Sequence, residues 1–152
     1  FPYGIRPRSD QGYIALLPEI APSEMTLPCG TRVQTTLLPH GSRFVSLGMV
    51  FTEKKSGTRV AYYTDCSDVP EEAIALADGA DILVIDALHR PPHPTHLNFD
   101  KALAVSGAVR AKKTIFTHMT FRVDYARDSA TLPPDVVLGY DGMRLRTDIP
   151  TV

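Results

Sequence analysis

Several imidazole and carboxylate side chains stand at or just past the ends of β-type segments. They are His40, Asp65, Asp86 and His118, with His89, His93 and His96 in a proline-rich loop after Asp86. In layered α/β proteins ligands bind beyond the carboxyl ends of strands, so we expect these groups to share one rim. Imidazole and carboxylate bind zinc, manganese and iron, and one aspartate can bridge two ions. The pattern indicates a metal site, and two adjacent ions are one arrangement that can promote cleavage of a phosphate ester.

Three β-type segments in succession must position the first two of these residues. The segments are residues 31–38, 43–51 and 58–64. They are rich in β-branched and aromatic residues and partly alternate in polarity, as half-buried strands do. A polar turn with a late glycine at residues 54–57 is typical of a hairpin. We therefore expect antiparallel strands, with His40 after the first and Asp65 after the third.

Two helices are predicted in the second half of the chain. Asp68 is the expected cap of the first helix, with Pro70 in its first turn and an end near Gly79. Asn98 is the expected cap of a second helix over residues 99–109. Each helix stands between two β-type segments, as in proteins whose sheets carry helices on the outside.

Continuous apolar segments over residues 81–88 and 113–117 are typical of strands buried on both faces. Together with the helices they give the order β-α-β-α-β over residues 58–118, which predicts an α/β fold. The last predicted elements are a strand at 136–138, a turn at Asp141 and Gly142, and a strand at 143–145. We expect these to form a terminal hairpin.

Composition indicates one globular domain over residues 1–152, with residues 1–30 largely irregular. The net charge of −1 implies no basic face, so a large nucleic acid is not favoured as a partner, whereas a small phosphorylated substrate is compatible. No segment approaches the ~20 apolar residues of a membrane helix. Cys29 and Cys66 match no metal-binding spacing and predict a reduced, cytoplasmic protein, although a disulfide between them stays open.

A resemblance to a known family rests on five motifs that occur in order. They are LPHGS, YYTD, DILVIDALHRPPHPTH, TIFTHM and GYDGM. The series resembles the metallo-β-lactamase-fold phosphodiesterases, in particular the phosphoribosyl cyclic phosphate phosphodiesterases of phosphonate breakdown. The resemblance implies the C-terminal half of an αββα sandwich, with a mixed sheet and outer helices. It also implies a metal-dependent hydrolase that cleaves a small cyclic or nucleotide-like phosphate ester with a metal-bound hydroxide.

The resemblance further implies roles for individual residues in a site of two divalent ions, zinc or manganese. His40 would be a ligand of the first ion and His118 of the second, and Asp65 would bridge both. His96 would be the general acid that protonates the leaving oxygen.

The remaining residues have weaker counterparts in the family. Arg90 and His93 would hold the phosphate of the substrate. Asp86 and Asp141 would support the site from behind, although Asp141 is first of all a turn residue and Asp86 is also compatible with a structural role.

One departure from the family is large, because its His-x-His-x-Asp-His cluster of four ligands is absent. Two protein ligands for each ion are too few for tight binding, so we expect this chain to bind metal weakly and to be inactive alone. The chain opens at Phe1 rather than at methionine. We expect the missing N-terminal half to have been cleaved or omitted, or to be a second chain, and a natural variant that has lost it is the third alternative.

Other functions stay open. Within hydrolases, the substrate could instead be a thioester or an RNA 3′ end, with the near-neutral charge arguing mildly against RNA. From a different class comes a non-catalytic half-domain that pairs with a chain carrying the missing ligands. Half of a sandwich leaves one sheet face uncovered, so we expect association with a complementary chain or with a second copy.

Structural interpretations compete with these roles. His40 is compatible with an ordinary turn, Asp65 with a turn before the first helix, and His118 with a satisfied core histidine. His89 is expected on the surface of the loop. Cys66 is expected to be a small buried residue rather than a nucleophile.

Overall fold

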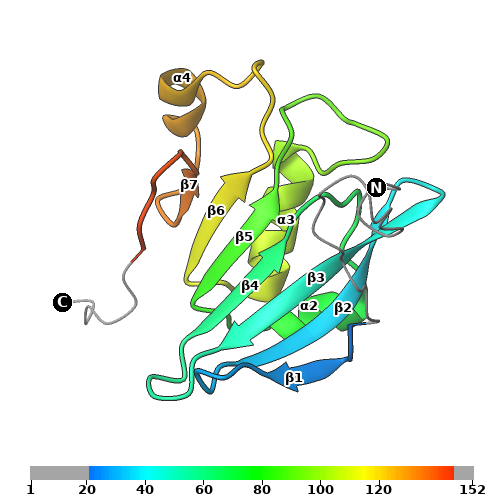
Figure 1. Ribbon diagram of the computed structural model, residues 1–152. Coiled ribbons are helices and arrows are strands. Elements are labelled where there is room, and N and C mark those ends of the chain that lie inside the picture. Colours follow the sequence, from blue (N-terminus) through cyan, green and yellow to red (C-terminus); the bar gives the residue numbers. More distant parts are fainter. Residues whose placement is uncertain (1–20, 146–152) are drawn as a thin grey trace, which may run out of the picture.

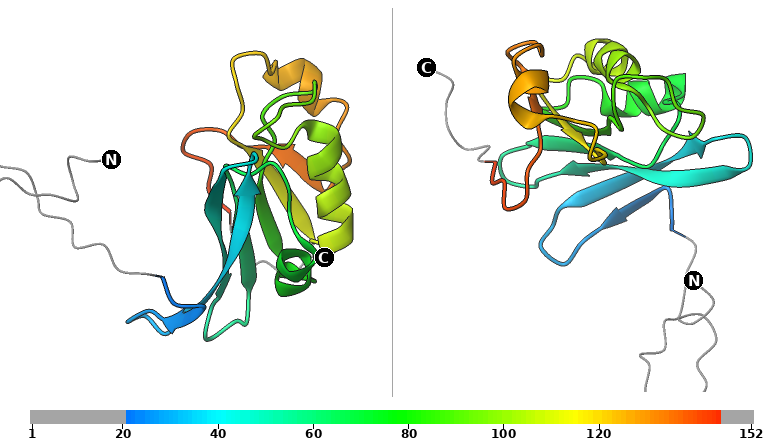
Figure 2. Two further views of the ribbon diagram at one scale, coloured as in Figure 1. Left: turned by 90° about the vertical axis from the view of Figure 1, so that its right-hand side faces the viewer. Right: turned by 90° about the horizontal axis from the view of Figure 1, so that it is seen from above.

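The computed structural model describes residues 21–145, which form a seven-stranded sheet with helices on one face (Figures 1 and 2). The strands are β1 (Glu24–Thr26), β2 (Arg32–His40), β3 (Phe44–Thr52), β4 (Arg59–Tyr63), β5 (Ile82–Asp86), β6 (Lys113–Thr117) and β7 (Val136–Leu138). The helices are α2 (Glu71–Ala77), α3 (Phe99–Val109) and α4 (Tyr125–Ser129). This is the predicted mixed α/β sheet with outer helices. Among the described residues, no helix has the length and apolar character that a membrane crossing requires.

The sheet is antiparallel in its first half and parallel in its second. Strands β1 to β4 pair antiparallel, as the hairpin turn predicts. From β4 to β7 the pairing is parallel, with α2, α3 and α4 as the crossover connections. Because two reversals separate β2 from β4, these two strands run in the same direction. The carboxyl ends of β2, β4, β5 and β6 therefore all meet at one edge of the sheet.

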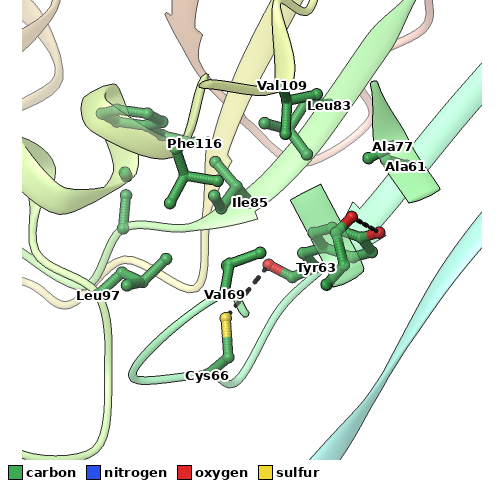
Figure 3. Close-up of a cluster of buried hydrophobic side chains, with 14 of the residues drawn as sticks. Ala61, Tyr63, Cys66, Val69, Ala77, Leu83, Ile85, Leu97, Val109 and Phe116 are labelled. Atoms are coloured by element: carbon green, nitrogen blue, oxygen red, sulfur yellow. Dashed lines mark hydrogen bonds between the residues drawn. The ribbon is translucent and has the colours of Figure 1, made fainter. Parts of the chain in front are cut away.

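The core lies between the sheet and the helices α2 and α3 (Figure 3). Tyr63 of β4 is fully buried and donates a hydrogen bond of 2.7 Å from its hydroxyl to the carbonyl oxygen of Ala73 in α2. Phe116 of β6 packs edge-on against Phe99 of α3, with ring centroids 5.1 Å apart. These contacts fix the helices over the strands whose ends carry the predicted site.

Gly48 of β3 lies under the Tyr63 ring, and this contact predicts the effect of a substitution. A Cβ atom at Gly48 would lie 2.9 Å from the ring and 3.0 Å from a methyl group of Leu38. Gly48→Ala should therefore lower the free energy of unfolding by about 1–3 kcal/mol through overpacking. Gly107 of α3 is the matched control, because a Cβ there meets nothing within 4 Å. Gly107→Ala should raise the free energy of unfolding by up to about 1 kcal/mol. Urea denaturation measures the free energy of unfolding of both variants. Equal changes in the two variants would contradict the packing argument.

The opposite face of the sheet is apolar and exposed. Leu37 of β2 pairs with Leu47 of β3, and their side chains are 60% and 39% exposed. Val45 and Tyr62, on the same face by strand alternation, are 63% and 40% exposed. Within residues 21–145 no second layer covers this face (Figure 2).

Two predictions about local structure are wrong. Asp68 does not cap α2, since the cap position is Pro70, which offers no side-chain acceptor, and the Asp68 carboxylate instead accepts from the amide of Val69. The terminal hairpin is absent from the described residues, because β7 pairs parallel with β6 and residues 143–145 form no strand. The short helix α4 was not predicted. Residues 1–30 were expected to be largely irregular with at most one strand; residues 1–20 lie outside the described residues, and the rest contains the short strand β1.

Candidate metal centre

One carboxylate oxygen of Asp65 lies at the centre of three imidazole rings. Its Oδ1 atom is 3.5 Å from Nδ1 of His40, 3.6 Å from Nε2 of His118 and 3.8 Å from Nδ1 of His96. These side chains come from the ends of β2, β4 and β6 and from the loop after β5. The structure thus brings together the three predicted ligands and the predicted general acid.

The backbone at two of these positions is left-handed. Asp65 has φ of 58° and His118 has φ of 60°, just past the ends of β4 and β6, the two parallel strands that flank β5. Non-glycine residues rarely adopt this conformation, and such strain clusters at functional sites. Both side chains face His96: Oδ1 of Asp65 lies 3.8 Å from its Nδ1 atom, and the His118 ring stacks on the His96 ring with centroids 4.9 Å apart.

His96 is held in place by Asp86, the last residue of β5. Nδ1 of His96 lies 2.9 Å from Oδ2 of Asp86, and the same oxygen accepts a hydrogen bond of 2.9 Å from the amide of Cys66. Asp86 is fully buried, and its Oδ1 atom has no hydrogen-bond partner among the described residues. Burial raises the pKa of Asp86, and the hydrogen bond from His96 opposes that shift. Asp86 therefore lies behind His96, where the sequence placed a supporting residue.

The loop that carries His96 is fixed at its base by backbone hydrogen bonds. The amide of Leu97 donates to the carbonyl of Cys66, and the amide of Leu88 donates to the carbonyl of Leu97. His93 stands next to His96, with ring centroids 5.1 Å apart, and burial together with the charge of His96 lowers the pKa of His93. His89 was predicted on the surface, but it is buried, with Nδ1 2.9 Å from the carbonyl of Pro91.

Arg90, predicted to hold phosphate, faces away from the imidazole cluster. Its Nε atom donates to the buried carboxylate of Asp128 in α4 at 2.7 Å, and its Nη2 atom donates to the hydroxyl oxygen of Thr131. The guanidinium also lies over the ring of Phe99, 5.1 Å from the centroid. In this arrangement Arg90 anchors α4 to the loop.

The Arg90–Asp128 pair predicts a pH dependence of stability. Hydrogen bonds from Arg127 and Arg90 hold the pKa of Asp128 far below its ordinary value. A depressed pKa contributes stability that is present above about pH 4 and lost as the pH falls further toward the folded-state pKa. Asp128→Asn should therefore lower the urea midpoint at pH 7, and the gap to the unmodified chain should shrink below about pH 4. The exposed Asp135 is the control: a similar pH-dependent gap for Asp135→Asn would contradict the assignment.

Asp141 lies in the wall of a cavity beside His118. The cavity has a volume of about 460 Å³ and is lined by Val84 and Ile115 of the sheet, by His118, and by Tyr140 and Asp141. Tyr125 packs edge-on against Tyr140, with centroids 6.3 Å apart. Asp141 thus stands near the site without contacting the predicted ligands through any described hydrogen bond.

The residues present fit a divalent metal. Donor atoms of His40, Asp65 and His96 all lie within 4.8 Å of one another, and so do those of Asp86, His96 and His118. Nδ1 of His40 is buried and lacks a hydrogen-bond partner among the described residues. An unpaired buried nitrogen facing a carboxylate is the environment that a bound cation satisfies. The sequence missed that His96 stands at ligand distance, because no spacing along the chain reports how its loop folds back.

Comparison with known proteins identifies the family. The profile of the beta-lactamase superfamily domain matches residues 10–119. No curated protein matches the chain.

Solved structures with the same fold include three of interest. A diphosphatase from the PhnP family is 28% identical, with a TM-score of 0.75 over 86% of this chain and 48% of that chain. The short form of human tRNase Z is 26% identical, with a TM-score of 0.63 over 78% of this chain and 44% of that one. Zn²⁺-bound PqqB from Methylobacterium extorquens is 18% identical, with a TM-score of 0.65 over 84% and 54%, and shows the fold alone. The chain spans about half the length of these structures.

Proposed function

This chain belongs to the metallo-β-lactamase superfamily of hydrolases, and on that premise we propose that it supplies half of the active site of a metal-dependent phosphodiesterase. Its substrate would be a small cyclic or nucleotide-like phosphate ester. The observation that carries the proposal is the single Asp65 oxygen within 3.5–3.8 Å of three imidazole nitrogens. The two similar structures above 25% identity support the substrate class, since a diphosphatase and a tRNase both cleave bonds at phosphorus.

His40, Asp65 and His118 would hold the metal ions. A divalent ion there supplies Lewis acidity, which activates water and neutralises charge on the phosphate oxygens. The proposal names zinc or manganese, because His and Asp donors suit both.

His96 would deliver a proton to the leaving oxygen as the bond from phosphorus breaks, while water supplies the new hydroxyl on phosphorus. The contact with Asp86 supports this role by fixing the ring. His93 is better placed than Arg90 to bind a phosphate oxygen, since His93 adjoins His96 and Arg90 is held by Asp128.

Reconstitution tests the proposal. The chain would be co-expressed with the part of the PhnP-family diphosphatase that it does not cover, where the family resemblance implies the His-x-His-x-Asp-His cluster. We expect about two equivalents of metal in the complex, by mass spectrometry, and hydrolysis of 2′,3′-cyclic AMP. The same complex with His96→Ala should keep its metal and lose roughly 10²–10⁴-fold in rate. A folded complex that contains two metal ions but does not hydrolyse the cyclic nucleotide would contradict the proposed phosphodiesterase activity.

A non-catalytic half-domain is the second candidate, and the exposed apolar face of the sheet favours it. This surface fits a complementary chain or a second copy of this one. Under this alternative the reconstituted complex forms but gains no metal. Metal content and complex formation therefore separate the two candidates.

A further inference from the structure

We propose that this chain by itself holds one divalent metal ion through His40, Asp65 and His96, with His96 as a ligand rather than a proton donor. The family resemblance assigns His96 to acid catalysis and leaves each ion only two ligands from this chain. The inference needs no residue outside this chain and does not depend on hydrolysis.

The geometry of the three side chains carries the proposal. Nδ1 of His40 lies 3.5 Å from Oδ1 of Asp65, and donor atoms of His40, Asp65 and His96 all lie within 4.8 Å of one another. The rings of His40 and His96 meet edge to face, with centroids 4.9 Å apart. Two imidazoles and one carboxylate, with positions left for water, form a recurrent three-ligand metal site.

The hydrogen bonding around these groups leaves donors available. Nδ1 of His40 is buried and unpaired among the described residues. No described hydrogen bond occupies the Asp65 carboxylate, whose side chain is 51% exposed and therefore open to an ion from solvent. The site thus combines an unsatisfied buried nitrogen with a free anionic oxygen.

Asp86 completes the arrangement from behind. By accepting a hydrogen bond from Nδ1 of His96, Asp86 leaves Nε2 with its lone pair free, as in carboxylate–histidine–metal arrangements. Asp86, His96 and His118 also lie close enough to form a competing set. We favour the Asp65 set, because Asp86 is fully buried, whereas the Asp65 side chain is 51% exposed and accessible to an ion from solvent.

A histidine that binds metal cannot at the same time protonate a leaving group from the same nitrogen. The two roles of His96 therefore belong to different states. In the chain alone His96 fills a ligand position, and when the missing donors are supplied it is released to act on the substrate.

The test uses the full 152-residue chain, titrated with Co²⁺ by visible absorption and with Zn²⁺ by calorimetry. We expect one equivalent of either metal. His96→Ala should weaken Zn²⁺ affinity at least about tenfold, and Asp86→Asn should weaken it by a similar factor. His93→Ala is the matched control from the same loop and should change affinity by less than about twofold.

Three results would overturn the proposal. They are a folded chain that binds neither metal, a stoichiometry of two, and a His96→Ala variant that binds as the unmodified chain does. A fourth arm separates the two ligand sets: His118→Ala should retain affinity within about threefold, and a loss as large as that of His96→Ala would also overturn the assignment. Far-UV circular dichroism establishes that each variant is folded.

Discussion

Replacement of Asp65 by asparagine is expected to lower the affinity of the chain for Zn²⁺ by roughly a hundredfold or more. Loss of a residue that only hydrogen-bonds to a metal ligand lowers metal affinity by about 10–100-fold, and loss of a ligand itself should cost at least as much. The reason is the position of Oδ1, which three imidazole nitrogens approach within 3.8 Å. Asparagine keeps the shape of the side chain and removes the negative charge that a divalent ion needs. Zn²⁺ titration by calorimetry measures the change.

The fold should survive this substitution, which makes the result interpretable. Asparagine tolerates the left-handed backbone at position 65, where φ is 58°. The free energy of unfolding should therefore stay within about 0.5 kcal/mol of the unmodified chain. Asp68, exposed and three residues further on, is the matched control, and Asp68→Asn should bind Zn²⁺ normally. Equal affinity in the Asp65 and Asp68 variants would remove Asp65 from the metal site.

Leu37→Glu combined with Leu47→Glu is expected to turn an associated chain into a monomer. The two leucines are direct neighbours across β2 and β3 and lie in the exposed apolar face of the sheet. Apolar surface contributes about 25 cal/mol per Å² when it is removed from water, so an apolar sheet face favours self-association. Two carboxylates at the centre of that surface would have to be desolvated on association. The association constant should fall by at least about a hundredfold, the equivalent of ~2.7 kcal/mol.

Sedimentation velocity at several concentrations measures this effect. Phe121→Glu is the control, because Phe121 is 95% exposed but lies in the loop after β6, away from the sheet face. The control should leave the association constant unchanged. An unmodified chain that sediments as a monodisperse monomer would contradict the proposal that this face is an interface.

Local sequence patterns were sufficient for most of the sheet. Strand β6 and helix α3 have the predicted bounds, because an uninterrupted apolar run and an asparagine cap are strong local signals. The failures involve partners far away in the sequence. Strand β7 pairs with β6 across the loop that contains α4, and a turn at residues 141–142 cannot reveal that parallel pairing. A strand at 143–145 would need a neighbour for its backbone groups, and no described strand supplies one.

The candidate site also has one part that the sequence predicts and another part that depends on distant contacts. His40, Asp65 and His118 could be placed together from the sequence, since each follows a strand and strands of one direction end at one edge. The close approach of His96 to Asp65 could not be predicted from spacing along the chain, because it depends on hydrogen bonds between residues 66, 88 and 97 that close the loop. The same limit explains Arg90, whose partner Asp128 is 38 residues away in a short helix without an apolar period.

The left-handed backbone at the ends of β4 and β6 has a consequence for which substitutions this sequence would accumulate without selection for function. Glycine would occupy both positions with less conformational energy than Asp65 or His118. Under random mutation with selection for solubility alone, Asp65 and His118 should therefore be replaced earlier than the buried residues of the core. A library of variants sorted only for expression should enrich glycine at both positions, and sorting for metal uptake should restore the acidic and imidazole groups.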